Sequence, residues 1–374
     1  MKQRHLFSRH TVLNLASNRF AIFALRQADK FKFFTFYFLL FTFLLSPLAA
    51  GAADITQQLH RPLNNSGLGR QSRDEADSLL RIGKQQYTSG YSEKTIDSCL
   101  QALEIYHSIG DLRAQGITYD LLAKAYIQLD RFKEGENALR RRLAIARDTQ
   151  DFQSQIFTLN NISTLLLQQG EPVAAGKTVT EAVTIARNVK NIEGEGLSLS
   201  NLGLVTARLG DYNRAIKLYE TALTFRRQTG DTLGEINTLN NLGDAYLAAG
   251  NYPDTIGTYG YAMRIAKTIS DRPNQLRSID GLVIAHSAVG RYERAFDLLQ
   301  ERLIIAQELQ NVREQLKSFE SYAQLYEQLG NYPTARNFYE RAILLARKLE
   351  DSKQEVLLVD KLTKLVKKSM VKRQ

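Results

Sequence analysis

Apolar residues recur at helical spacing in short segments, and the segments themselves recur about every 20 residues. In residues 231–250, Leu239, Leu242, Ala245 and Tyr246 fall at i, i+3, i+6 and i+7, along one side of an α-helix. The next segment has a second apolar stripe, made of Ile256, Tyr259, Ala262, Met263 and Ala266. The pattern predicts two helices of about 16 to 18 residues in every 40-residue period.

Glycine stands at one fixed position of this period. The series is Gly90, Gly170, Gly210, Gly250, Gly290 and Gly330, with Asp130 in its one gap. Glycine adopts the left-handed conformation that ends a helix at little steric cost, and aspartate tolerates it better than most residues. We therefore expect a tight turn between two helices at each of these positions.

Short acidic or amide side chains form a second series in step with the first. Its members are Asp111, Asp151, Asn191, Asp231, Asp271, Asn311 and Asp351. An oxygen on a short side chain can accept a hydrogen bond from an unpaired N–H group at the start of a helix. The series therefore predicts helix N-caps. The first unit has Ser72 and Glu75 instead, at capping-box spacing.

The two series divide residues 71–350 into seven units of two antiparallel helices. Because such units bury their apolar faces only against their neighbours, the period indicates a solenoid of stacked repeats. Residues 351–374 are expected to form a C-terminal capping helix and a basic tail. The basic residues that would face solvent at this end are Lys361, Lys364, Lys367 and Lys368.

The small residues of the units resemble those of the tetratricopeptide repeat (TPR) family, over residues 71–370. The family pattern has a large residue, Leu, a small residue and a large residue on the first helix, then small–aromatic–small on the second. In the fifth unit these positions hold Leu239, Leu242, Gly243, Tyr246, Thr255, Tyr259 and Ala262.

The period of 40 residues exceeds the usual TPR period of about 34 and is similar to that of kinesin light chains and bacterial exported TPR proteins. The resemblance implies an all-α, right-handed superhelical solenoid of about seven TPR helix hairpins plus the capping helix. Its first helices would line a concave groove that binds a peptide or protein.

Three residues depart from the family pattern. Arg142 and Arg302 stand where a small residue is expected. Either their stems pack while the guanidinium groups reach water, or they project into the groove as anchors for an anionic group. Val283 also replaces a small residue, which predicts looser or different packing in the sixth unit.

The N-terminal segment predicts export. Residues 33–45 form an apolar run that follows seven basic residues and one acidic residue, and Ala50-Gly51-Ala52 comes after it. This arrangement is typical of a secretory signal peptide at 1–52, which would deliver the protein to the periplasm or an equivalent lumen. The alternative is an uncleaved membrane anchor at 33–53. Residues 53–70 are interpreted as a polar linker.

The composition and motifs argue against nucleic-acid binding, an intramolecular disulfide and a catalytic or metal site. The net charge is +10, but much of it lies in residues 1–52, and the mixed charges that remain argue against nucleic-acid binding. The single cysteine, Cys99, excludes an intramolecular disulfide and is expected to be a buried, inert thiol, with interchain pairing as the alternative. The sequence has no metal-ligand spacing and no phosphate-binding loop, so we expect no cofactor, no metal site and no enzyme activity.

Asparagines recur at one position of the first helices and are the candidates for peptide binding. Asn161, Asn201 and Asn241 occupy this position, and Asn160 and Asn240 precede two of them. In related TPR proteins an asparagine at this site commonly bonds the backbone of an extended peptide, and the resemblance implies the same role here. Further polar groove candidates are Arg208, Asn237, Arg277 and Lys317. The alternative is that the asparagines bond within or between repeats and set the helix spacing.

The predicted function is that of a non-enzymatic scaffold or adaptor that binds a peptide segment or protein in its concave groove after export. The alternative is a structural or assembly protein that acts by self-association or in a membrane-tethered complex. A third possibility is an accessory arm of an enzyme complex whose catalytic site lies in another chain.

Overall fold

The computed structural model describes residues 66–371, and within this range it contains helices and turns but no strand. The predicted signal or anchor segment and most of the predicted linker lie outside the described residues. Within the described range, residues 69–371 form one compact unit. The fifteen described helices are α3 (Ser66–Thr88), α4 (Ser92–Ile109), α5 (Leu112–Gln128), α6 (Phe132–Asp148), α7 (Phe152–Gln168), α8 (Pro172–Asn188), α9 (Ile192–Arg208), α10 (Tyr212–Thr229), α11 (Thr232–Ala248), α12 (Tyr252–Thr268), α13 (Arg272–Ala288), α14 (Tyr292–Glu308), α15 (Val312–Gln328), α16 (Tyr332–Lys348) and α17 (Ser352–Val371).

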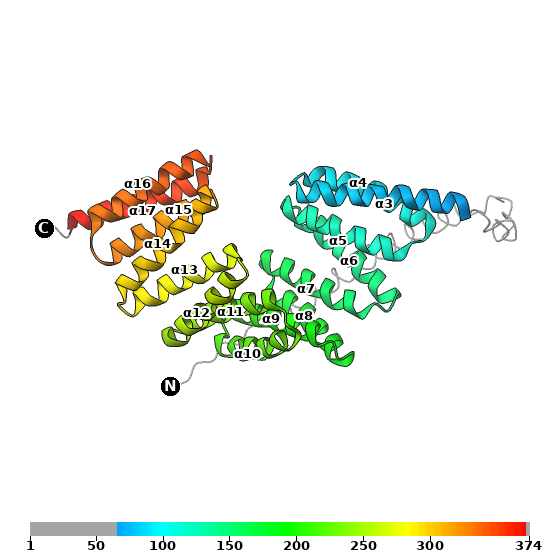
Figure 1. Cartoon of the computed structure of the whole chain (residues 1–374), viewed down its shortest axis with the longest axis horizontal. Helices are drawn as coiled ribbons and strands as arrows, with labels where there is room; N and C mark the ends of the chain where they lie inside the picture. The colour runs from blue at the N-terminus through cyan, green and yellow to red at the C-terminus, as the bar shows by residue number, and fades with distance from the viewer. Residues whose placement is uncertain (1–65, 372–374) are drawn as a thin grey trace, which may run out of the picture. The chain divides into compact units, whose positions relative to one another are not determined.

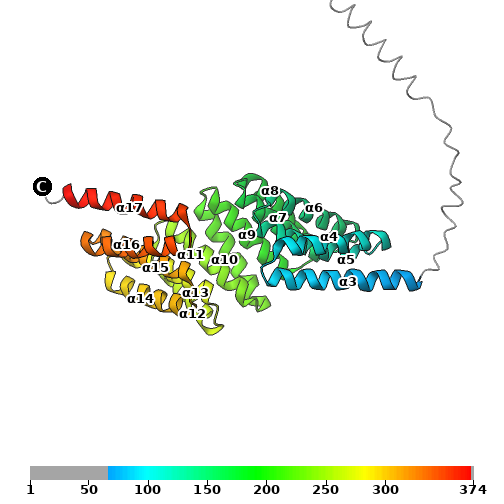
Figure 2. The same ribbon diagram turned by 90° about the horizontal axis from the view of Figure 1, so that it is seen from above.

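Each helix packs against the next one along the chain, as the predicted solenoid requires (Figures 1 and 2). The first helices of neighbouring units also touch one another, as α7 does α9 and α11 does α13. The odd-numbered helices are therefore the first helices of the units, and the even-numbered helices are the second ones. The predicted all-α solenoid of helix hairpins is confirmed.

The turns confirm the glycine series and add a second one. Gly250 has φ +74° and Asp130 has φ +57°, so both positions are left-handed, as predicted. The chain is also left-handed at the residue before each N-cap of the other series, where glycine is mostly absent. This second set consists of Gly110, Gln150, Lys190, Gly230, Ser270, Gln310 and Glu350. Every connection between consecutive helices from α3 to α17 thus uses one left-handed residue.

The predicted N-caps are confirmed at all seven positions of the Asp/Asn series. Asp231, for example, accepts a hydrogen bond from the backbone N–H of Gly234 at 2.9 Å. The exception is the first unit, where the predicted cap at Ser72 is wrong because α3 begins earlier, at Ser66. No proline lies between Ser66 and Ser72, and the helix runs through Gly67 and Gly69 although glycine is a poor helix former.

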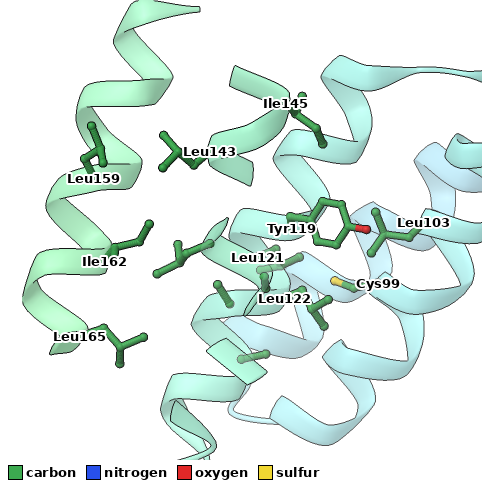
Figure 3. Packing of buried hydrophobic residues seen from close by; sticks show 14 of the residues in the cluster. Cys99, Leu103, Tyr119, Leu121, Leu122, Leu143, Ile145, Leu159, Ile162 and Leu165 are labelled. Carbon is green, nitrogen blue, oxygen red and sulfur yellow. The ribbon is translucent and has the colours of Figure 1, made fainter. Parts of the chain in front are cut away.

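The buried core consists of the residues that the periodic pattern selects. Figure 3 shows the first part of it, where side chains from α4, α5, α6 and α7 converge. Cys99 lies in this cluster with no exposed surface, and burial raises the pKa of its thiol to about 12. The predicted buried thiol is thereby confirmed. A thiol with so high a pKa carries almost no reactive thiolate at neutral pH.

Tyr259 is the aromatic residue of the fifth unit and packs between two glycines. A Cβ atom at Gly243 would lie 2.8 Å from its ring, and one at Gly281 would lie 2.2 Å away. In the sixth unit the equivalent of Gly243 is Val283, which shares a core cluster with Leu299. Val283 is 7% exposed, so the unit is packed differently rather than loosely.

His286 occupies a core position of the sixth unit and is expected to make stability depend on pH. Burial, together with the charges of Arg291 and Arg294, holds its pKa below the ordinary value of 6.5. The folded state therefore binds fewer protons than the unfolded chain, so the unfolding free energy falls as the pH drops through 6.5 toward the lowered pKa. His286→Leu should flatten this slope, because the equivalent Leu166 is buried at 4% exposure. Thermal melting from neutral pH to about pH 5 tests this, and equal slopes in the two proteins would contradict it.

Candidate functional site

The first helices present a common face with hollows between neighbouring units. One hollow of about 190 Å³ lies between α5 and α7, and another of about 320 Å³ lies between α9 and α11. A third, of about 290 Å³, lies between α13 and α15. We call this face the groove face. It is the surface on which the sequence places the peptide-binding candidates.

The hollow between α9 and α11 is lined by both apolar and polar side chains. Leu204, Ala207 and Tyr219 contribute carbon surface to it, while Arg208 and Asn241 contribute polar groups. The Arg208 side chain is exposed at the last turn of α9 and has no hydrogen-bond or ion-pair partner among the described residues. An unpaired guanidinium group beside an apolar hollow can bind an anionic or carbonyl oxygen of a ligand.

Two of the predicted groove residues, Asn160 and Asn240, are buried, with 1% and 0% of their surface exposed. The Asn160 amide donates to Ser198 Oγ at 2.8 Å in the next unit, and its oxygen accepts from Asn201 Nδ2 at 2.7 Å. Ser278 Oγ donates to the oxygen of Asn240 at 2.7 Å. These two residues therefore face the neighbouring first helix and not the groove, as the structural alternative proposed.

The same link recurs between consecutive first helices. Residues 160, 200 and 240 each bond the residue 38 positions later, and the middle link joins the Ser200 and Thr238 hydroxyl groups at 3.0 Å. Each link is fully buried, where an unmade hydrogen bond would be costly. The row of links sets the register of α7, α9, α11 and α13 and thereby fixes how the groove face is spaced.

The other candidates do lie at the surface, in two groups. Asn161 and Asn237 are exposed and have no hydrogen-bond partner among the described residues. Asn241 is engaged, since its oxygen accepts from Arg277 at 2.7 Å. Lys317 is exposed and bonds Glu314 of its own helix at 2.8 Å. The structure thus brings Asn241 and Arg277 together, with Asn237 one helical turn before Asn241. Arg277 and Lys317 also line one hollow of about 360 Å³, whereas Asn161 lies in a separate one.

Asp244 is a groove residue that the sequence reasoning did not identify. It accepts a hydrogen bond from Tyr259 Oη and an ion-pair contact from Arg277 at 2.6 Å. Burial, reinforced by the charge of Asp244 and its hydrogen bond, raises the pKa of Tyr259 far above its ordinary value, so the phenol is the donor. The signal in the sequence was its position, one helical turn after Asn241 on the same face.

Arg302 follows neither of the two interpretations drawn from the sequence. Only 1% of its side chain is exposed, and all its N–H groups are engaged. It forms a bidentate pair with Asp280, at 2.5 and 3.1 Å, and bonds the Glu314 carboxylate at 2.9 Å. It is thus a buried cross-link between α13, α14 and α15, and no donor is left for a ligand.

Arg142 at the equivalent position is half-buried and donates to Ser154 Oγ, and its guanidinium group lies against Gly116. It too contacts the following first helix, although it does not form the carboxylate pairs of Arg302.

The described residues contain no group of three or more His, Cys, Asp and Glu side chains placed to hold a metal ion. Among the helices in residues 66–371, none combines the length and apolarity that a membrane span needs.

Comparison with solved structures shows the same fold at low sequence identity. The chain is similar to the apo form of RapI (15% identity, TM-score 0.58, 74% of this chain and 99% of that one). It is similar to a Rap protein complexed with competence and sporulation factor (17%, TM-score 0.54, 74% and 75%). It also matches a Pyrococcus horikoshii signal transduction ATPase with numerous domains and a tetratricopeptide repeat sensor (18%, TM-score 0.59), covering 76% of this chain but only 44% of that one.

Comparison with curated protein sequences finds no match. Comparison with models of protein families does find matches. A tetratricopeptide repeat model matches residues 154–228, 194–259 and 234–308, and a second model of the same description matches residues 316–349. Together these matches span half of the chain and coincide with the helix hairpins. The protein belongs to the tetratricopeptide repeat family, whose repeats generally serve protein interactions.

Proposed function

We propose that the protein is a non-enzymatic adaptor that binds an extended peptide segment of a partner on its groove face, at the units that contain α7 to α11. The observation that carries the proposal is the pair of exposed asparagines without partners, Asn161 and Asn237, on a face that also has apolar hollows. A side-chain amide offers a donor and an acceptor together, which is what an extended peptide backbone requires.

The hollows supply the other half of such a site. Apolar side chains of the peptide would enter the spaces between neighbouring first helices, while Arg208 in the lining of one of them would bond a peptide oxygen. The buried links at Asn160 and Asn240 hold the first helices in register, so the face is largely formed before a ligand arrives. A preformed site lowers the entropic cost of binding.

The family and its structural relatives support this proposal in general terms. A solved Rap relative is complexed with competence and sporulation factor, which is a property of that protein. For the present chain we propose binding after export to the periplasm or an equivalent lumen. The support is the sequence pattern of residues 1–52, with an anchor at 33–53 as the second version.

A display library of short random peptides, panned against the full chain, would test the groove. We expect selected peptides to bind Asn161→Leu/Asn237→Leu about tenfold more weakly than the wild type, because losing two hydrogen bonds is worth about 1.4 kcal/mol or more. The matched control is Asn213→Leu/Asn337→Leu, two exposed asparagines on second helices. Fluorescence anisotropy gives the affinities.

Equal affinity for both double variants would contradict a site on the groove face. If no peptide is selected and the mass of the protein in sedimentation rises with concentration, the assembly function is the better description.

A further inference from the structure

Helix α17 exposes apolar residues at positions that are buried in earlier first helices. Val356 and Val359 have 68% and 41% of their surface exposed. One to three units earlier the same register positions hold residues such as Ile236 and Leu239, which are 0% and 3% exposed because the helices that follow, α12 and α13, pack against α11. Among the described residues, no helix covers this side of α17.

A hollow of about 390 Å³ adjoins this face. It lies between the start of α16 and the end of α17 and is lined by Pro333, Arg336, Val366 and Met370, among others. In the sixth unit the corresponding space, beside the end of the first helix α13, is filled by the start of the second helix α14. The first residue of α14, Tyr292, packs against the core there. The hollow therefore marks where the first turn of a further helix would lie.

The face has a positive rim. Helix α17 has five lysines and two acidic residues. Lys361 and Lys368 are paired with glutamates of α15, and Lys364 is paired with Asp360. Lys353 and Lys367 have no ion-pair partner within residues 66–371. Two copies of α17 packed together would oppose like charges, whereas an acidic helix would neutralise them.

The shape of the face restricts the central residue of an occupant. Thr363 stands where earlier units have Gly243 or Val283. Gly243 accommodates a tyrosine ring, and a Cβ atom there would lie only 2.8 Å from it. The β-branched Val283 is instead matched by Leu299. Thr363 is also β-branched, so the occupant needs an aliphatic central residue.

We propose that the exposed face of α17 binds an acidic amphipathic helix of a partner protein, with a leucine or valine between small residues on its apolar side. The bound helix completes a hairpin with α17 and covers Val356 and Val359, and its carboxylates pair with Lys353 and Lys367. This is a helix-in-groove contact. It is separate from the groove face and stands independently of the peptide site proposed there.

The probe that tests this is a labelled, stapled peptide with the sequence of residues 292–308 and Arg302→Ala. This sequence is α14, the second helix that packs with Val283, and it has four acidic residues against Arg294. The staple is needed because so short a helix is marginal in water. We expect saturable binding to the full chain in fluorescence anisotropy, weaker as salt is raised.

Val356→Lys/Val359→Lys should lower the affinity for the peptide at least tenfold, while Ile304→Lys/Leu344→Lys should leave the affinity unchanged. Ile304 and Leu344 are exposed to similar extents, 47% and 61%, but lie on second helices. Lys353→Glu/Lys367→Glu should also weaken binding of the peptide. A second peptide, with its acidic residues changed to lysine, should bind this double variant more tightly than the original peptide does. Circular dichroism melting confirms that each variant is folded.

Three results would overturn the proposal. The first is no saturable binding of the stapled peptide to the wild type. The second is equal binding to Val356→Lys/Val359→Lys. The third is a concentration-dependent dimer that this double variant abolishes, because the occupant would then be a second copy of the chain.

Discussion

Gly281→Ala is expected to destabilise the protein by about 2 kcal/mol, even though alanine normally favours a helix over glycine by about 1 kcal/mol. The new Cβ atom would lie 2.2 Å from the ring of Tyr259, which also contacts Gly243 on its other side. The ring cannot move away easily, because its hydroxyl is bonded to Asp244. Overpacking of the core therefore outweighs the gain in helix propensity.

Thermal or urea unfolding measures this effect, and the chain offers a matched control. Gly260 lies in α12 with nothing within 4 Å of an added Cβ atom. Gly260→Ala should therefore stabilise the protein by about 0.5 to 1 kcal/mol, the opposite sign for the same substitution. Adding Tyr259→Leu to Gly281→Ala should restore part of the lost stability, because the clash is then removed. A stabilising Gly281→Ala would show that the ring does not occupy this space.

Arg302→Met is expected to have the largest effect, about 3 kcal/mol, because it removes the five hydrogen bonds of the buried guanidinium group and leaves Asp280 and Glu314, whose side chains are 42% and 18% exposed, without their partner. In the wild type, burial alone would raise the pKa of Glu314, but hydrogen bonds and charges from Lys317 and Arg302 outweigh it and hold the pKa below its usual range. A lowered pKa in the folded state contributes stability above the ordinary pKa of 4.5, and this is lost as the pH falls through the folded value. The difference in unfolding free energy between Arg302→Met and the wild type should therefore become smaller at acidic pH.

The control for Arg302 is an exposed arginine in an ion pair. Arg336 pairs with Glu340 at 2.7 Å, but 61% of its side chain is exposed, so Arg336→Met should change stability by less than about 1 kcal/mol. The variant Arg302→Met/Asp280→Asn/Glu314→Gln should recover much of the loss by removing the charges. If Arg302→Met unfolds like the Arg336 control at neutral pH, the buried cross-link is not formed in solution.

Local features of the chain were predictable from sequence because their causes lie within a few residues. The Asp231 cap needs only an acceptor three residues before a free N–H, and the turn at Gly250 needs only a residue that tolerates positive φ. The apolar stripes predicted the core for the same reason. The second left-handed series, at residues such as Gln150 and Lys190, escaped prediction because neither residue type favours that conformation and the packing of the helices imposes it.

The candidate site depended on neighbours that are distant in sequence. Asn160 and Asn161 are adjacent and chemically identical, yet one is buried in a link to Ser198 and the other is exposed on the groove face. The rotation of about 100° between consecutive helical residues decides which of them meets the next first helix. Arg302 likewise shows no sign in sequence of its partners Asp280 and Glu314.

The amino-acid sequence by itself thus determined the repeat, the helices, the caps of the Asp/Asn series, one of the two series of turns, and the class of protein, because each depends on spacing within a unit. Only the tertiary structure decided which polar side chains hold the units together and which remain free on the groove face. It also decided that α17 keeps an uncovered apolar side. These properties depend on what packs across from each residue, and a residue's own position in the period does not specify that.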